Sequence, residues 1–572
     1  MLITGLAVFI LTVSCVTAVV VDSPFGRVKG QEITAKNGKS FYSFQGIPFA
    51  KPPVGELRFA KPVAHPKIAG TLEALAMKPS CVQETYALLP GEEISEDCLY
   101  LNIYAKEIRP ARQPSKVLVW IHGGGFLLGS YFMYNCESFV TNHDVIVVTI
   151  SYRLGALGFL STENEASKGN YGMWDQVLAL RWVKDNIAAF GGDPNDVAIA
   201  GESAGGASVS LLSVSPAATG LFTKAFSTSG SATSLFTQYF NAQTEALKIA
   251  KQVNCWDGEL DAKISLRQSE IIVECLRTRP AEELTKGVVY KLDRMPFVPR
   301  VDGEFLPQSP LKLVRDNRYL ESLGFYERSY LVSFNNYEQS VIELILYFHD
   351  QTINARNVSI DEKARQKQEL YQTLPGLAVR DRLEVEDVPQ NLIDRIYGWY
   401  TRRYIGVKSL AALFTDLFFE IPTFEMLNVM SRKNSTNARL LYFNHFPQFV
   451  SGSIRGMPHV LDLVYWFDIP LEVIRSFVGI ESQGNFTAED HELKRVYSSI
   501  IADFVKTGNA ERSILPSLPG GWPTYDPVES PYLDFNPHFS IQRNLAREKR
   551  LLWETLVPQW ATGDRNIEHL EL

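Results

Sequence analysis

Asp196-Val-Ala-Ile-Ala-Gly-Glu-Ser-Ala-Gly-Gly206 is the stretch that decides the fold. Its apolar start, 197–200, follows a Gly-Asp-Pro-Asn turn signal and predicts a short strand buried on both faces. The strand runs into Gly-x-Ser-x-Gly and a helix-compatible segment, which is the context of a nucleophile elbow. Glycine is needed on either side of Ser203, because a Cβ in so sharp a turn would clash. A plain Gly-Ser turn is the alternative, and the rest of the chain decides between them.

Apolar strands alternate with helical segments along most of the chain. Helical periodicity is clear at 174–190 and 497–506, and mainly helical insertions are expected at about 233–317 and between Glu338 and about 430. This alternation predicts an α/β fold with a mostly parallel central sheet, helices on both faces and helical insertions. No segment has the composition of a linker, so residues 19–572 are predicted to form one domain. Strands are predicted at 41–50, 99–104, 117–121, 145–151, 225–229, 330–333 and 440–444.

The overall composition limits the classes of protein to which the chain can belong. Hydrophobic residues make up 45% of the 572 residues and charged residues 21%, so a large packed core is expected. The formal net charge of −8 argues against a nucleic-acid partner, because such partners require clustered positive charge.

The N-terminus has the features of a targeting segment. Residues 1–21 carry no charged side chain, and an apolar centre at 6–11 precedes the small residues Val16 and Ala18. This pattern predicts a cleaved secretory signal at residues 1–18. An uncleaved membrane anchor is the alternative, although the apolar run is barely long enough to span a bilayer. No later apolar run reaches about 18 residues, so no transmembrane segment is expected in the mature chain.

Two further features fit a secretory route. The C-terminal His569-Leu570-Glu571-Leu572 matches the His-Asp-Glu-Leu retention signal at all but its second position, so both retention in the endoplasmic reticulum and secretion stay open. Acceptor tripeptides for N-glycosylation begin at three asparagines. They are Asn357, Asn434 and Asn485.

The cysteines are expected to form disulfides in such a compartment. Cys81 and Cys98 bracket one loop, and Cys255 and Cys275 bracket another. We predict that each pair is bridged, because short loops in an oxidising lumen are easily closed. Buried free thiols are the alternative, and this alternative suits Cys136 best. Neither pair has metal-ligand spacing, and no metal site is predicted.

A serine nucleophile needs a base, a group that orients the base, and donors for the developing oxyanion. The run Gly123-Gly124-Gly125 ends a predicted buried strand, where backbone N–H groups free of side chains can approach a carbonyl oxygen closely. The N–H of Ala204, directly after the serine, would complete an oxyanion hole. His122 precedes the glycines and is expected to support their loop.

Among the histidines, His459 is the best candidate base, because it follows Gly456 and Pro458 in a loop before an apolar segment. His445 lies among strand aromatics and is expected to be a core residue. Glu338, just after the strand at 330–333, is the best-placed acid. The remaining candidates are expected to be solvated, to cap helices or to lie in the tail. They are Glu343, Asp350, His349, His491, His538 and His569.

With these motifs the sequence resembles the type B carboxylesterase/cholinesterase family of α/β-hydrolases, specifically its insect esterases, over nearly the whole mature chain. The motifs that carry the resemblance are Glu96-Asp-Cys-Leu-Tyr-Leu-Asn102, His122-Gly-Gly-Gly-Phe126, Gly169-Asn-Tyr-Gly172, Gly201-Glu-Ser-Ala-Gly205 and Gly456-x-x-His459-x-x-Asp462-Leu463. The resemblance implies a Ser203–His459–Glu338 triad, oxyanion donors at Gly124, Gly125 and Ala204, and the same two disulfides. One departure is Gln339, where the family usually has glycine after its acid.

The resemblance implies a serine carboxylesterase that acts on small-molecule esters and needs no metal or organic cofactor. A catalytically silent adhesion protein of the same fold is the alternative from another class, but such proteins lack part of the triad and continue into a membrane segment. Within enzymes, a juvenile hormone or pheromone esterase is the alternative. Juvenile hormone esterases typically have Gln where this chain has Glu202, which favours a general esterase.

Overall fold

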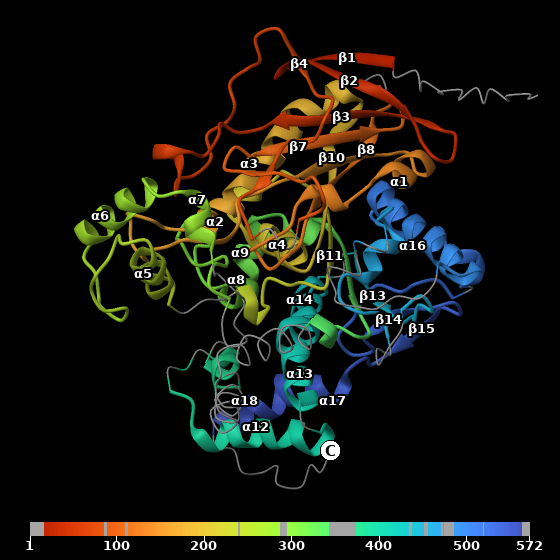
Figure 1. Cartoon of the computed structure of the whole chain (residues 1–572). Coiled ribbons are helices and arrows are strands. Elements are labelled where there is room, and N and C mark those ends of the chain that lie inside the picture. Colours follow the sequence, from red (N-terminus) through yellow and green to blue (C-terminus); the bar gives the residue numbers. More distant parts are fainter. Residues whose placement is uncertain are drawn as a thin grey trace, which may run out of the picture.

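The computed structural model describes residues 17–562 except for fifteen gaps of one or more residues. One large sheet organises the described chain, in the order β1-β2-β3-β7-β9-β8-β10-β11-β12-β13-β14-β15, with β4 beside β2. The seven strands from β9 to β14 in this order are parallel to one another, and antiparallel strands extend the sheet at both ends (Figure 1). The gaps are 85–87, 109–111, 238–240, 287–294, 342–372, 374, 381, 384, 386, 406, 434–436, 451–455, 471–472, 474–484 and 519.

The strands are β1 (Thr17–Ser23), β2 (Gly26–Thr34), β3 (Ser40–Pro48), β4 (Thr71–Glu73), β5 (Ser80–Cys81), β6 (Ile94–Ser95), β7 (Tyr100–Ala105), β8 (Ser115–Ile121), β9 (Val145–Ile150), β10 (Gly192–Glu202), β11 (Lys224–Thr228), β12 (Ser329–Asn335), β13 (Asn437–Phe443), β14 (Pro531–Phe535) and β15 (Ser540–Arg543). The helices are α1 (Glu137–Asn142), α2 (Gly155–Phe159), α3 (Tyr171–Asn186), α4 (Ala204–Val214), α5 (Ala242–Gln252), α6 (Leu266–Arg277), α7 (Ala281–Thr285), α8 (Pro310–Arg315), α9 (Asn317–Ser322), α12 (Gln390–Arg403), α13 (Val407–Thr415), α14 (Ile421–Met430), α16 (Ala488–Thr507), α17 (Arg547–Leu551) and α18 (Val557–Ala561).

The central strands bury both faces, as their continuous apolar runs predict. Along β10, Val197 and Ile199 belong to one hydrophobic core, whereas Ala198 and Ala200 belong to a second core on the other face. The same alternation along β8 places Val119 in the first core. The sheet therefore separates two cores, and each must be covered by helices.

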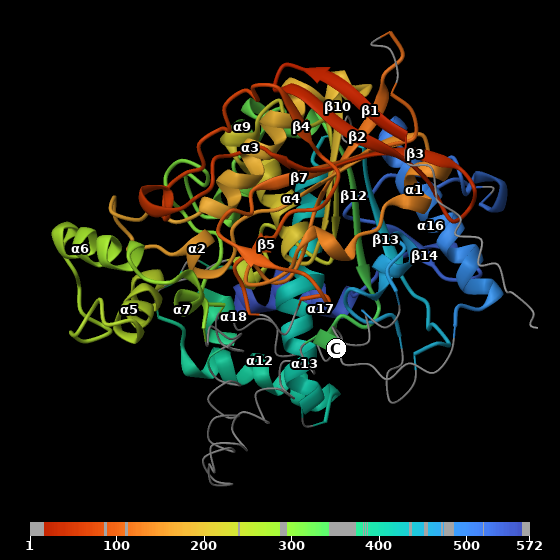
Figure 2. The ribbon, with the colours of Figure 1, turned by 45° about the horizontal axis from the view of Figure 1, so that its top comes forward.

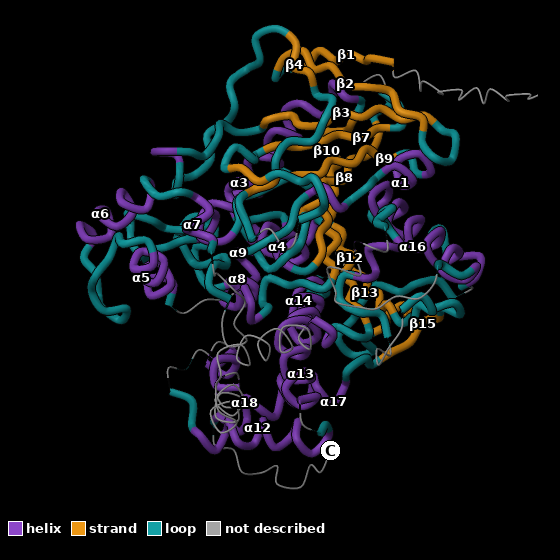
Figure 3. Tube along the Cα trace, in the orientation of Figure 1, coloured by secondary structure: helices purple, strands orange, loops and turns teal. Residues whose placement is uncertain are grey.

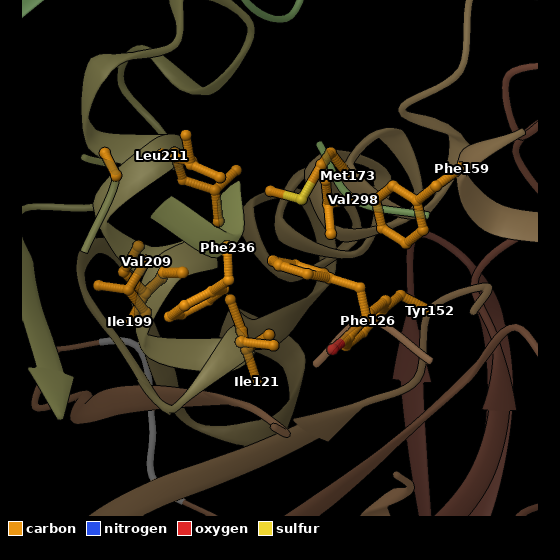
Figure 4. Packing of buried hydrophobic residues seen from close by; sticks show 14 of the residues in the cluster. Ile121, Phe126, Tyr152, Phe159, Met173, Ile199, Val209, Leu211, Phe236 and Val298 are labelled. Atoms are coloured by element: carbon orange, nitrogen blue, oxygen red, sulfur yellow. The ribbon is translucent and has the colours of Figure 1, made fainter. Parts of the chain in front are cut away.

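Helices α3 and α4 cover the first core, and α1 and α16 lie against the opposite face (Figure 3). In the first core, Ile121 and Ile199 of the sheet lie near Val209 of α4 (Figure 4). Beside them Phe126 packs edge-on against Phe159, with ring centroids 5.3 Å apart. This packing holds the ends of β8 and β10 rigidly against the helix that follows β10.

The helical insertions lie in the connections between neighbouring parallel strands of the sheet. Helices α5 to α9 lie between β11 and β12, and α12 to α14 lie between β12 and β13. Helices α12, α13, α17 and α18 form a group at one end of the molecule (Figures 1 and 2). None of the helices within the described ranges has the length and apolarity needed to cross a bilayer.

Two element boundaries differ from the sequence expectation. Strand β10 begins at Gly192 rather than at Val197, because the predicted turn residues extend the strand through an irregular register between these two positions. Strand β1 begins at Thr17 and pairs with β2, so the predicted signal boundary after Ala18 falls inside this strand. The rest of the predicted signal, and the tail 563–572, lie outside the described residues.

Both predicted disulfides form, Cys81–Cys98 and Cys255–Cys275. Cys136 is a buried free thiol, as expected for the cysteine without a loop partner.

Candidate active site

The nucleophile elbow has the predicted geometry. Ser203 lies between β10 and α4 with φ 56° and ψ −120°, a conformation that L side chains rarely adopt. A Cβ on Gly201 would lie 2.5 Å from the carbonyl carbon of Gly205, and a Cβ on Gly205 would lie 2.1 Å from the carbonyl oxygen of Ile121. The two glycines are therefore required by space, and the turn places the half-buried serine at the carboxyl end of the strand.

The glycine loop after β8 lies directly beside this serine. Gly124 and Gly125 have φ of 106° and 60°, which glycine adopts without strain. A Cβ on Gly123 would lie 2.7 Å from the backbone oxygen of Glu202 and 3.2 Å from the Cβ of Ser203. The absence of side chains therefore lets this backbone approach the elbow, as the sequence predicts.

His122 supports the loop, as expected from its place before the glycines. Its Nδ1 lies 3.0 Å from the Gly123 carbonyl oxygen, and its ring stacks on Tyr152 with centroids 4.4 Å apart. Burial lowers the pKa of His122 to about 4. The imidazole is therefore neutral at physiological pH and can donate Nδ1–H to the carbonyl.

His459 and Glu338 meet although 121 residues separate them in sequence. His459 Nδ1 lies 2.5 Å from Glu338 Oε2, and both side chains are buried. The His459 backbone N–H also donates to Ser340 Oγ at 2.9 Å. Gln339 thus leaves the contact between Glu338 and the histidine in place.

Two groups at the ends of neighbouring strands hold the other oxygen of the Glu338 carboxylate. Ser229, just after β11, donates its hydroxyl to Oε1 at 2.5 Å, and the backbone N–H of Asn335 donates to the same atom at 2.7 Å. The carboxylate is therefore fixed on both sides, with Oε2 left to face His459.

The Nε2 side of His459 faces another acid. Glu202 Oε1 lies 3.2 Å from Nε2, and no hydrogen bond joins the hydroxyl of Ser203 to His459 among the described residues. The structure thus brings the candidate base and the candidate acid together, and Ser203 directly follows Glu202 of the same cluster without a hydrogen bond to His459. Such bonds are often long in unliganded enzymes and tighten only with substrate bound.

Negative charge is concentrated around this imidazole. Burial alone would lower the pKa of His459, but the carboxylates of Glu202 and Glu338 outweigh burial and raise it. Burial also raises the pKa of Glu202, and the nearby acids Asp462 and Glu338 add to this effect. Burial raises the pKa of Asp462 to about 6, although Asn335 Nδ2 donates to it at 2.9 Å. The site therefore favours a positive imidazolium.

Aromatic side chains cover the histidine. The ring of Phe419 lies 4.9 Å from that of His459, and Phe236 lies 5.6 Å from Phe418 and 6.2 Å from Phe419, all measured between centroids. A substrate group that reaches the histidine would therefore meet an apolar wall.

Sequence reasoning assigned no role to Glu202, Ser229, Asn335 or Asp462. Glu202 directly precedes Ser203, and Asp462 follows His459 by three residues. Both therefore lie in the motifs that contain Ser203 and His459, and this proximity in sequence is a signal that could have identified them as acids near the site. Ser229 and Asn335 carry no such signal, because only the pairing of β11 with β12 brings them together.

The other candidates lie elsewhere. His445 is a buried core histidine, with Nε2 2.8 Å from Asp490 Oδ1, as predicted. His491 and His538 are exposed, and Asn485 is also exposed. The remaining candidates lie outside the described residues. They are Glu343, Asp350, His349, His569, Asn357 and Asn434.

Comparison with known proteins fits this geometry. The sequence model of the carboxylesterase family matches residues 17–553. The chain belongs to the carboxylesterase family. It is a serine carboxylesterase with the α/β-hydrolase fold, and the silent and hormone-specific alternatives are not favoured.

Several curated relatives resemble this esterase over most of their length. It is 31% identical to the medium-chain fatty acyl-CoA hydrolase precursor of Anas platyrhynchos, over 96% of this chain and 94% of the relative. It is 33% identical to the acylcarnitine hydrolase of Mus musculus, over 93% and 90%. The acetylcholinesterase of Bungarus fasciatus is 29% identical over 96% and 88%.

Proposed function

We propose that Ser203, His459 and Glu338 are the catalytic triad of this carboxylesterase. Ser203 Oγ attacks the ester carbonyl carbon while His459 Nε2 takes the hydroxyl proton. The bond to the alcohol oxygen then breaks as the imidazolium returns that proton to the departing alcohol. Water repeats the sequence on the acyl-enzyme and releases the acid. The observation that carries this proposal is the 2.5 Å contact between His459 Nδ1 and Glu338 Oε2, near the strained turn at the half-buried Ser203.

The developing oxyanion would be bound by the backbone N–H groups of Gly124, Gly125 and Ala204. Ala204 is the first residue of α4, and the first N–H groups of a helix have no acceptor within it. The positive end of the helix dipole adds to this stabilisation. The neighbouring carboxylates would favour the imidazolium that forms at the same moment.

The nucleophile is tested by Ser203→Ala. This change removes the attacking oxygen, so ester hydrolysis should fall by about 10⁴- to 10⁶-fold, and covalent labelling by an organophosphate should be lost. Circular dichroism and the Tm check that the fold is intact. Near-normal turnover in the folded variant would refute the assignment.

We propose neutral, lipophilic esters as the substrates. The wall formed by Phe236, Phe418 and Phe419 supports an apolar group near the histidine. The loop from Cys81 to Cys98 has no tryptophan, whereas the cholinesterases place a choline-binding tryptophan there and quaternary ammonium groups bind such aromatic faces. Aliphatic and aryl esters should therefore be hydrolysed faster than choline esters of equal acyl length. Higher kcat/KM for the choline ester would contradict this expectation.

We also propose that the enzyme enters the secretory pathway, after cleavage of residues 1–18, and carries a glycan at Asn485. The exposure of Asn485 and the two disulfides support this route. Deleting residues 569–572 tests retention: the full chain should stay in the cell lysate, whereas the deletion variant should appear in the medium. Equal secretion of both would mean that the tail is not a retention signal.

A further inference from the structure

A π turn carries the aromatic side chains that cover His459. The helix from 407 to 430 is continuous, but residues Asp416–Glu420 are wound as a π-helix between α13 and α14. Pro422 provides a cause, because it has no N–H to give to the carbonyl of Phe418 four residues earlier and its ring would clash there. Isolated π turns are rare and occur frequently at functional sites.

Two backbone carbonyl groups of this helix accept hydrogen bonds from the loop that follows β11. Ser234 donates its hydroxyl to the Phe418 carbonyl oxygen at 2.7 Å, and Ser231 donates to that of Pro422 at 3.0 Å. The same loop begins with Ser229, which holds Glu338. The π turn and the acid are therefore tied to one loop.

A charged cluster, in which Asp416 is buried and Lys549 and Glu420 are partly buried, holds both ends of the π turn. Lys549 Nζ lies 2.7 Å from Asp416 Oδ1 and 2.9 Å from Glu420 Oε2. Tyr400 of α12 donates its hydroxyl to Asp416 Oδ2 at 2.5 Å, and Trp553 Nε1 donates to that hydroxyl at 2.9 Å. Asp416 is completely buried, so its negative charge requires a partner.

Lys549 belongs to α17, far from the triad in sequence. Burial lowers its pKa, but the carboxylates of Asp416 and Glu420 outweigh burial and hold the pKa well above its ordinary value. The lysine is therefore charged at every physiological pH. A second π turn, Leu552–Leu556, follows it and carries Trp553 into the cluster.

We propose that Lys549 is a positioning residue that acts through Asp416 and Glu420 to hold Phe419 against His459, and so sets the size of the ester group admitted. This inference rests on the proposed function of His459. An α-helix advances 100° per residue, so a π turn that relaxed by one residue would rotate Phe419 away from the imidazole. The alternative is a salt bridge that contributes to stability alone.

The test compares the kcat/KM values of p-nitrophenyl acetate and p-nitrophenyl octanoate in the full chain. Phe419→Leu should change the octanoate-to-acetate ratio by about fivefold, as expected when a pocket wall loses volume. Lys549→Met should change the ratio in the same direction. When Lys549→Met is added to Phe419→Leu, the double variant should have nearly the same ratio as Phe419→Leu alone, because both substitutions act on the same contact. The ratio cancels any loss of folded protein within a preparation.

Lys224→Met is the matched control, because Lys224 is also a lysine paired with an aspartate, Asp196, but lies at the start of β11. It should lower the Tm without changing the ratio. Glu420→Gln keeps the Lys549–Asp416 pair, and the same ratio is measured in this variant if Lys549→Met does not fold. An unchanged ratio in the folded variants, or additive effects with Phe419→Leu, would overturn the proposal. Hydrolysis that survives Ser203→Ala would instead refute the proposed triad.

Discussion

Two buried clusters in this molecule place a basic side chain between carboxylates. His459 lies between Glu338 and Glu202, at 2.5 and 3.2 Å, and Lys549 lies between the two acids of the first π turn at 2.7 and 2.9 Å. The geometries are similar, but the bases differ. In the proposed mechanism the imidazole gains and loses its proton during turnover, whereas the ammonium keeps its charge at every physiological pH.

The surroundings of the two bases are similar. In the lysine cluster, Tyr400 donates to Asp416 Oδ2 and Trp553 donates to the Tyr400 hydroxyl, whereas Asp416 Oδ1 has no hydrogen bond beyond its contact with the ammonium. In the histidine cluster, Glu202 Oε1 likewise has no hydrogen bond beyond its contact with the imidazole. The comparison shows that the ordinary pKa of the base, and not the number of satisfied acceptors, separates a group that can exchange its proton from one that keeps it.

The largest expected difference between the clusters is catalytic. Glu338→Gln should lower kcat by roughly 10⁴-fold, because an amide favours the wrong tautomer of His459. The same carboxylate-to-amide change at Glu420 should leave the turnover of p-nitrophenyl acetate within a few-fold of wild type. Steady-state kinetics measure both variants. Comparable losses of turnover in Glu338→Gln and Glu420→Gln would contradict the expected difference in catalytic role between the two clusters.

The second difference concerns stability. Lys549→Met leaves the buried carboxylate of Asp416 and the partly buried one of Glu420 without their cation and should lower the free energy of unfolding by about 3–5 kcal/mol. Glu202→Gln should leave it unchanged or raise it, because the variant removes a buried charge that is poorly hydrogen-bonded. Thermal and urea unfolding of both variants measure the contrast, and a clear loss of stability in Glu202→Gln would contradict it.

The smallest effect is on pH dependence. As the proposed base, His459 works only as neutral imidazole, and the carboxylates of Glu202 and Glu338 raise its pKa, with a smaller effect from Asp462. Glu202→Gln removes one of these charges, so the pKa of His459 should fall and the acid limb of kcat/KM should move to lower pH. A pH profile with p-nitrophenyl butyrate tests the sign, and a shift to higher pH would be inconsistent with the assigned electrostatics.

Much of the fold follows from patterns that are local in the sequence. The central strands, the long helix α3 and the turn at Ser203 could be predicted because buried parallel strands and tight glycine turns leave strong local signals. The start of β10 was missed, because Gly192 and its neighbours have turn composition but continue the strand through an irregular register.

The site was only partly predictable for a physical reason. Ser203, His459 and Glu338 could be proposed because each follows a strand and has a chemistry that narrows the choice. Ser229 and Phe419 could not, since their importance depends on which loops meet above the sheet. A single sequence carries the strand positions but not the strand order that brings such loops together.

The distance in sequence between Ser203 and the side chains that complete its site also has a consequence for biosynthesis. The cluster that we propose for positioning Phe419 is completed only by Lys549, close to the end of the 572-residue chain. A ribosome adds about 5–20 residues per second, so the elbow emerges tens of seconds before the last of these side chains. In the proposed mechanism the nascent chain therefore carries Ser203 without its base, and ester hydrolysis must await the synthesis of His459.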